Sequence, residues 1–145
     1  MTQADKELLL KDLCARLDTN LVCSIYRTDD EGVGYRDEIL HGYCKGDIWY
    51  EFYFREDCSI GIDNVSKIKP YLFPFSSMTE EQEKEYNMLR DFVYTHHYEY
   101  EDIVEDMGLY DNWKSIDYLN KNHFDYRGLI PMGLAIDATG LNIYC

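Results

Sequence analysis

Apolar residues recur at spacings of three and four near the N-terminus, which is the period of an amphipathic helix. The apolar positions are Ala4, Leu8, Leu9, Leu13 and Leu17, and the opposite side carries Lys6, Glu7, Lys11 and Asp12. Thr2 and Asp5 have the spacing of an N-cap, and the turn-forming run at 18–20 ends the pattern. We therefore predict a helix over residues 2–17.

The period changes to two after residue 20, as it does in β-strands, where successive side chains point to opposite faces. Segments rich in aromatic and β-branched residues alternate in this way at 21–27, 35–44, 47–55 and 58–62. The links between them are too short for parallel crossovers, and Lys45-Gly46 fits a hairpin. Because proline lacks an N–H, Pro70 and Pro74 are expected to end regular pairing. These segments predict a small antiparallel meander of about four strands.

The second half of the chain returns to helical spacing. Ser77 with Glu80, or Thr79 with Gln82, has the spacing of a capping box that opens a helix. This helix either continues past residue 100 or breaks near 97–99. Its expected inward stripe is Tyr86, Leu89, Val93, His96, Tyr100, Ile103 and Met107.

A last helix is expected over about 112–123, with Trp113, Ile116 and Leu119 inward. The apolar tail after it should pack across the domain, because so many apolar residues are costly to leave in water. The chain has no internal repeat or linker composition. We predict one α+β domain over 1–145, with an N-terminal helix, the meander, two to three helices and the tail.

Charge and cysteine content narrow the function classes. The net charge is −14, and residues 76–145 carry 14 acids against 5 bases. This field disfavours direct binding to nucleic acid or to an anionic membrane, and it favours a basic partner. Five cysteines without Cys-x-x-Cys spacing, no signal peptide and no long apolar run predict a cytoplasmic protein with reduced thiols. Fourteen tyrosines and the apolar tail leave a homodimer open.

The stretch YTHHYEYEDIVED, residues 94–106, combines two histidines with five carboxylates. His97, Glu101 and Glu105 follow at four-residue steps, so a continuous helix would offer them to a metal ion. A single helical strip converges poorly, however, and runs of charge ordinarily face solvent. We therefore predict no metal, no cofactor and an acidic partner-binding face made by Glu99, Glu101, Asp102, Glu105 and Asp106.

The segment DIWYEFYFR carries the candidate for ligand binding. Strand alternation puts Ile48, Tyr50, Phe52 and Phe54 on one face and Trp49, Glu51, Tyr53 and Arg55 on the other. Aromatic planes beside guanidinium and imidazole groups suit a flat anionic ligand such as a nucleotide. The alternative is that a helix covers this face and makes Trp49 a core residue. The ligand-binding candidates are Arg36, His41, Tyr43, Trp49, Tyr53 and Arg55.

Catalytic motifs are absent from the sequence. It contains no Gly-x-Ser-x-Gly elbow, no phosphate-binding glycine loop and no His-Glu-x-x-His. Cys44 and His41 are three residues apart on one predicted strand, so they face opposite sides and make a poor nucleophile pair. The chain is therefore not expected to be an enzyme.

Three segments, KELLLKDLCARL, IKPYLFPFSSMTEEQEKEY and YLNKNHFDYRGLIPMGLAIDATGLNIY, together cover 58 of 145 positions. They resemble a family of short, uncharacterised acidic proteins of gut anaerobic bacteria, their phages and other mobile elements. The relatives have Pro-Tyr-Gly where this chain has Asp18-Thr19-Asn20, and often a charged residue near Pro131. The resemblance implies that the matched segments form the scaffold and that the centre of the chain forms the working surface.

The resemblance also implies a phage or mobile-element context, in which small acidic proteins often act on host machinery such as anti-phage defence. The leading hypothesis is a non-enzymatic protein that modulates or inhibits a host or phage component through its acidic half, residues 79–106, with nucleic-acid mimicry as one way to do so. The second is a sponge that sequesters a small nucleotide-like ligand. The third is a metal-assisted enzyme.

Overall fold

The computed structural model describes residues 1–29, 32–45, 50–55, 58–96 and 113–144. Helix α1 (Gln3–Ala15) begins with a capping box, in which Asp5 N donates to Thr2 Oγ1 at 3.1 Å and Thr2 N donates to Asp5 Oδ2 at 2.8 Å. This confirms the predicted N-cap. Leu9 and Leu13 face the core as predicted, but Asp12 is also fully buried. Its placement on the polar side of the helix was wrong, because a buried ion pair with Arg16 holds it inside.

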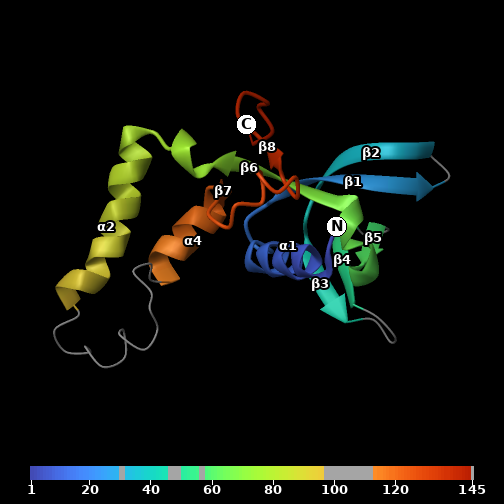
Figure 1. The fold of residues 1–145 in the computed structure, drawn as a ribbon, viewed down its shortest axis with the longest axis horizontal. Coiled ribbons are helices and arrows are strands. Elements are labelled where there is room, and N and C mark those ends of the chain that lie inside the picture. The colour runs from blue at the N-terminus through green and yellow to red at the C-terminus, as the bar shows by residue number, and fades with distance from the viewer. Residues whose placement is uncertain (30–31, 46–49, 56–57, 97–112, 145) are drawn as a thin grey trace.

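The larger sheet has the order β2–β1–β6–β7, with β8 also paired to β6 (Figure 1). Strands β1 (Val22–Asp29) and β2 (Gly32–Ile39) form an antiparallel hairpin, and β1 also pairs antiparallel with β6 (Ile68–Pro74). Two short strands from the end of the chain, β7 (Phe124–Asp125) and β8 (Ile136–Asp137), run parallel to β6. The C-terminal tail is thereby fixed to the sheet.

Strand β6 contradicts the prediction that Pro70 ends regular pairing, whereas it confirms Pro74, which is the last residue of the strand. Pro70 lies opposite Cys23 of β1, and Pro74 lies opposite Asp125 of β7. The first half of β6 pairs with β1, and its second half pairs with β7 and β8. A proline is tolerated in a ladder wherever the partner does not need its nitrogen as a donor. Leu72, between the two prolines, is fully buried.

A second sheet of three antiparallel strands contains β3 (Gly42–Lys45), β4 (Tyr50–Arg55) and β5 (Cys58–Gly61). The single strand predicted over 35–44 is therefore two strands in two sheets. The change occurs at Leu40 and His41. Leu40 N donates to Leu21 O in the first sheet, and His41 N donates to Tyr53 O in the second, both at 2.8 Å.

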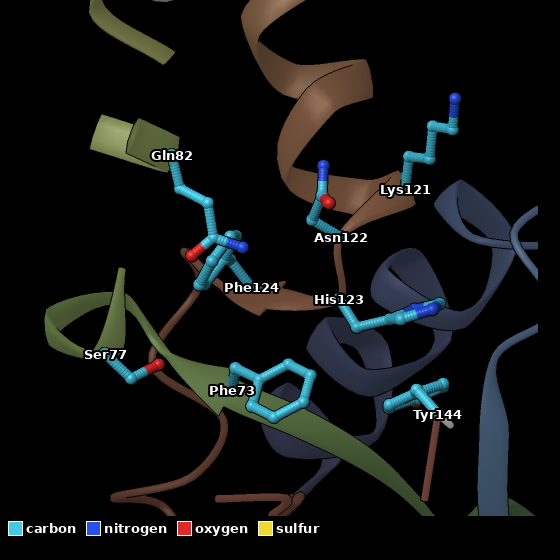
Figure 2. Close-up of a pocket in the computed structure, with 8 residues that line it drawn as sticks. All are labelled: Phe73, Ser77, Gln82, Lys121, Asn122, His123, Phe124 and Tyr144. Carbon is cyan, nitrogen blue, oxygen red and sulfur yellow. The ribbon is translucent and has the colours of Figure 1, made fainter. Parts of the chain in front are cut away.

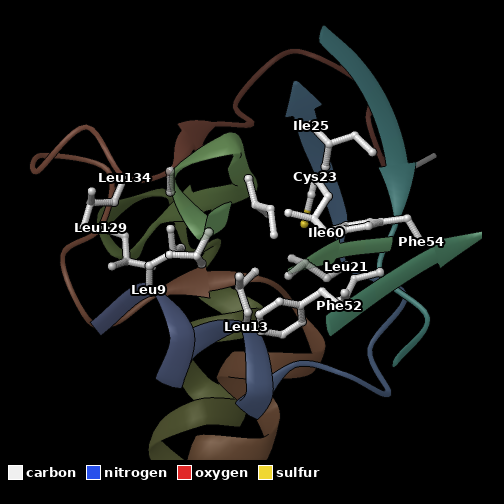
Figure 3. Close-up of a cluster of buried hydrophobic side chains, with 14 of the residues drawn as sticks. Leu9, Leu13, Leu21, Cys23, Ile25, Phe52, Phe54, Ile60, Leu129 and Leu134 are labelled. Carbon is white, nitrogen blue, oxygen red and sulfur yellow. The ribbon is translucent and has the colours of Figure 1, made fainter. Parts of the chain in front are cut away.

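The main core lies among the two sheets, α1 and the C-terminal tail, as Figure 3 shows. It contains Leu9 and Leu13 of α1, Cys23 and Ile25 of β1, Phe52, Phe54 and Ile60 of the second sheet, and Leu129 and Leu134 of the tail. Phe52 and Phe54 were predicted to share a face, and both are fully buried in this core. The prediction that the apolar tail packs across the domain is confirmed too.

Helices α2 (Glu80–His96) and α4 (Trp113–Lys121) lie together at one end of the molecule (Figure 1). They pack on a second, smaller core made by Tyr86, Leu119 and Phe124. Trp113 is 70% exposed, so its predicted inward position is wrong. The choice between a continuous helix and a break near 97–99 lies outside the described residues.

The start of α2 is fixed by the Thr79–Gln82 pair. Thr79 N donates to Gln82 Oε1 at 2.9 Å, and Gln82 N donates to Thr79 Oγ1 at 3.2 Å. Ser77, the alternative cap, donates its hydroxyl to Pro74 O at 2.6 Å instead. The predicted α+β class with an N-terminal helix is confirmed. No helix within the described ranges is long and apolar enough to cross a membrane.

Candidate functional site

The ligand-binding candidates on β3 and β4 lie on opposite faces of their sheet. Tyr43 is directly opposite Phe52, with ring centroids 5.0 Å apart, and packs against the main core. Tyr53 is the next residue after Phe52, so its side chain points to the other face, where it is half-buried. The expectation that Tyr43 joins Tyr53 was therefore wrong. Trp49 and the Arg55 side chain lie outside the described part of the chain.

The other two candidates come from elsewhere in the fold. Arg36 is half-buried in β2, opposite Ile25, and so belongs to the larger sheet. His41 is exposed in the two-residue passage between the sheets. The five candidates within the described residues are thus distributed over two sheets and a connection, and ligand binding by the six stays a prediction.

The acidic half of the chain is described only in part. The partner-binding candidates Glu99, Glu101, Asp102, Glu105 and Asp106 lie outside the described residues, as do His97 and the metal strip. At the start of α2, however, Glu80, Glu81, Glu83 and Glu85 are all exposed. Glu80, Glu81 and Glu83 are in the first turn, at the positive end of the helix dipole, which stabilises them there. The described chain therefore presents an ordered, solvent-facing group of carboxylates.

Metal binding finds no support in the part of the chain that is described. Among those residues, no group of three or more His, Cys, Asp or Glu side chains is arranged to hold an ion. The predicted His97 strip falls outside this part and stays untested.

A buried ionic cluster was missed in the sequence. Arg16 Nε and Nη2 donate to the two carboxylate oxygens of Asp12 at 2.8 and 3.1 Å, and Arg127 Nε lies 3.3 Å from Asp12 Oδ1. Arg16 Nη2 also donates to Phe124 O at 2.8 Å. Both arginines approach the ring of Tyr126, at 5.4 and 4.9 Å from its centroid. The cluster joins α1 to β7 and therefore has a structural role.

Asp125 organises the turn that follows this cluster. Its two carboxylate oxygens accept from Leu129 N and Ile130 N, both at 2.8 Å. Gly128 within the turn has φ +75°, a left-handed conformation that favours glycine. The turn carries Leu129 into the main core.

Next to the buried ionic cluster is a cavity of about 370 Å³ (Figure 2). Its walls come from the end of β6, the start of α2, the end of α4, β7 and the tail. The lining residues are Phe73, Ser77, Gln82, Lys121, Asn122, His123, Phe124 and Tyr144. No motif in the sequence identified this site.

His123 is the most constrained residue of the cavity wall. Its φ is +60°, unusual for a residue other than glycine, and its ring stacks on Tyr144 at 3.9 Å with an interplanar angle of 12°. Burial, and then the Arg16 charge, lower the pKa of His123 to about 4. His123 is therefore neutral at pH 7. Its Nδ1 is buried and has no hydrogen-bond partner within the described structure.

The hydroxyl groups that line the cavity are engaged in structural bonds. Ser77 donates to Pro74 O, and Tyr144 donates to Tyr71 O at 2.6 Å. Asn122 Nδ2 donates to Tyr118 O at 2.9 Å. Because Nδ1 of His123 is buried, it faces protein and not the open space of the cavity. The cavity thus offers aromatic walls and the Lys121 cation, which are features for holding a molecule.

Comparisons with known proteins give no family for this chain. No family model matches it, and neither a curated protein nor a solved structure does. The resemblance to acidic proteins of gut anaerobes and their phages stays a prediction.

Proposed function

We propose that this chain is a non-enzymatic binding protein of phage or mobile-element origin that modulates a host or phage protein. In this proposal its acidic helical half contacts a basic surface of the partner. The observation that supports it is the exposed group of Glu80, Glu81, Glu83 and Glu85 on the first turns of α2.

The way α2 is held makes these carboxylates suitable for docking. Tyr86 of α2 packs against Leu119 of α4 and Phe124 of β7, so the helix is fixed to the rest of the fold. A fixed helix loses little conformational freedom on binding, which lowers the cost of association. A group of negatively charged carboxylates also speeds the encounter with a basic surface.

The same helix carries an exposed apolar side chain. Met88 is 73% exposed, one helical turn beyond Lys84 and Glu85. Interfaces gain most of their affinity from a few desolvated contacts, while surrounding charges set orientation and specificity. Met88 would supply such a contact beside the acidic group, and methionine suits it because its side chain adapts to irregular surfaces.

Affinity capture with two charge-matched variants tests this proposal. One variant carries Glu80→Gln, Glu81→Gln and Glu83→Gln, which keeps the Thr79–Gln82 cap. The control carries Glu7→Gln, Asp18→Asn and Asp117→Asn at exposed positions elsewhere. The immobilised proteins are exposed to a lysate of a gut anaerobic bacterium, and bound proteins are identified by mass spectrometry.

The wild type and the control should retain the same basic protein. This protein should be released as the salt concentration rises from about 0.1 to 0.5 M, because exposed charges are screened over that range. The α2 variant should bind the purified partner about tenfold more weakly. Equal retention by both variants, or a retained set without a basic protein, would contradict the proposal.

A second candidate is sequestration of a small nucleotide-like ligand, and the cavity beside His123 favours it. Its volume of about 370 Å³ lies in the usual range of ligand pockets, roughly 300–1,000 Å³. A panel of nucleotides should then raise the melting temperature. Loss of that shift in Lys121→Gln would place the ligand in the cavity, and loss in Trp49→Ala or Arg55→Ala would place it on the sheet. No shift with any nucleotide would remove this candidate.

A further inference from the structure

Strand β2 forms the end of the larger sheet. Among the described strands it pairs only with β1, which leaves its other edge, here called the outer edge, without a described partner. Three apolar side chains on one face of β2 are exposed, Val33 at 70%, Tyr35 at 68% and Ile39 at 40%. We propose that two copies of the chain pair through this edge, β2 against β2 and antiparallel, as a two-fold homodimer.

The backbone of β2 fits this pairing. Leu40 N donates to Leu21 O, and the β1–β2 register runs without a shift from there to Gly32. Since hydrogen-bonded pairs alternate along an antiparallel ladder, the even residues direct their backbone groups at β1. The odd residues Tyr35, Asp37 and Ile39 therefore direct theirs to the outer edge. Strand β4 meets this edge just beyond Ile39, where His41 N donates to Tyr53 O. No proline interrupts this row.

The charges of β2 select one register. Arg36 and Glu38 point to the same face, which is the face of Ile25. A two-fold axis through Asp37 places each Arg36 opposite the partner's Glu38, so two ion pairs form. A shift by two residues would place Arg36 opposite Arg36, or Glu38 opposite Glu38. A shift by one residue would place side chains of the Ile25 face opposite side chains of the exposed face.

The other face of the strand agrees with the same register. It places each Tyr35 opposite the partner's Ile39, and aromatic and β-branched side chains pair well across strands. Asp37 meets its copy on the axis, but its Oδ1 accepts a hydrogen bond from Tyr71 OH at 2.8 Å. Tyr71 is in β6, beyond β1 from the outer edge, so this bond draws the carboxylate away from the axis.

Arg36 and Glu38 also interact within their own chain, so a single substitution does not isolate their contact with the second copy. Exchanging the charges between two variants isolates it. Sedimentation equilibrium should show a reversible dimer of the wild type. Arg36→Glu and Glu38→Arg should each raise its dissociation constant about tenfold, since two attractive pairs become repulsive. A one-to-one mixture of the two variants should restore the dimer, as opposite charges meet again. Lys67→Glu, an exposed control with the same charge change, should leave it unaltered.

Hydrogen exchange of the wild-type protein is a second test of the dimer, and it needs no substitution. The amides of Tyr35, Asp37 and Ile39 should be protected only at concentrations that populate the dimer, whereas those of Arg36 and Glu38 should be protected throughout. A monomer at every concentration would overturn the proposal. So would a mixture no tighter than its single variants, or concentration-independent exchange at the three odd positions.

Discussion

Arg16 holds Asp12 by two hydrogen bonds inside the protein, with both side chains at 0% exposure. The two residues are one helical turn apart, with Asp12 in α1 and Arg16 at its C-cap, and the guanidinium also reaches Phe124 O, 108 residues later in the chain. Burial of ions is costly unless each is paired and hydrogen-bonded. This relationship therefore fixes α1 against β7.

Asp12→Asn should destabilise the fold by about 3–5 kcal/mol, because it leaves the buried Arg16 charge without its counterion. Chemical denaturation monitored by circular dichroism measures the change. Asp18→Asn, an exposed carboxamide change just past the same helix, should cost less than about 0.5 kcal/mol. The double variant Asp12→Leu with Arg16→Met should be more stable than either single one. A loss below about 1 kcal/mol in Asp12→Asn would show that the pair is not buried in solution.

The stability of the fold should depend on pH through His123. Its pKa in the folded chain, about 4, lies below the ordinary 6.5, so the unfolded chain binds more protons between these values. The contribution of His123 to the free energy of unfolding is therefore complete above pH 6.5 and is lost as the pH falls towards 4. It should amount to roughly 2–3 kcal/mol.

His123→Asn isolates this effect, because asparagine does not titrate and accepts a positive φ. The free energy of unfolding, measured from pH 7 to pH 4, should fall less in this variant than in the wild type. Nearby Arg16 and Tyr144 stay in place. His41→Asn, which removes an exposed histidine, should retain the wild-type slope. Identical slopes in all three proteins would contradict the buried, neutral state of His123.

Asp125→Ala should cost about 2–4 kcal/mol, because the carboxylate accepts the amides of Leu129 and Ile130, and Leu129 is fully buried. Asp137 makes a comparable bond to Thr139 N at 2.9 Å, but it is exposed. Asp137→Ala should therefore cost less than about 1 kcal/mol, since water replaces the lost bond. Thermal melts of the two variants measure the contrast, and equal losses would count against the organising role of Asp125.

Tyr144→Phe removes one oxygen and keeps the ring that stacks on His123. The hydroxyl donates to Tyr71 O at 2.6 Å and accepts from Val22 N at 3.3 Å. Its loss removes both of these hydrogen bonds, so the variant should be about 1–2 kcal/mol less stable. Urea titration is the measurement. Tyr35→Phe, at an exposed ring, serves as the control and should change stability by less than about 0.5 kcal/mol.

Local signals were read correctly from the sequence where neighbours in the chain decide the outcome. The Thr2–Asp5 cap lies within one turn, so its residue types sufficed to place it. For the start of α2 the sequence offered Ser77–Glu80 or Thr79–Gln82, and the structure selected the second. The alternation around Phe52 and Phe54, which is also a short-range signal, placed these two side chains on one face, and the structure shows that both are buried. The apolar spacing also placed Leu9 and Leu13 on the buried side of α1, but it put Asp12 on the opposite side, and its pairing with Arg16 was missed.

Pairing between distant segments was not readable in this way. Pro70 indicated an end of pairing, yet β6 is an inner strand, because β1 and the later β7 and β8 supply its neighbours. Trp113 fits an inward helical stripe, yet it is exposed, because the small core beside α4 is filled by Tyr86 and Phe124. The division of 35–44 between two sheets likewise depends on Leu21 and Tyr53.

The amino-acid order alone settled the elements with short-range causes: capped helices, alternating strands, an apolar tail and a strongly acidic second half. The tertiary structure alone decided that Asp12 is buried, that His123 stacks on Tyr144 beside a cavity, and that β2 ends its sheet. These outcomes arise from contacts between segments up to 122 residues apart, such as Val22 with Tyr144. Burial and desolvation depend on all the atoms around a group, so no short stretch of sequence specifies them.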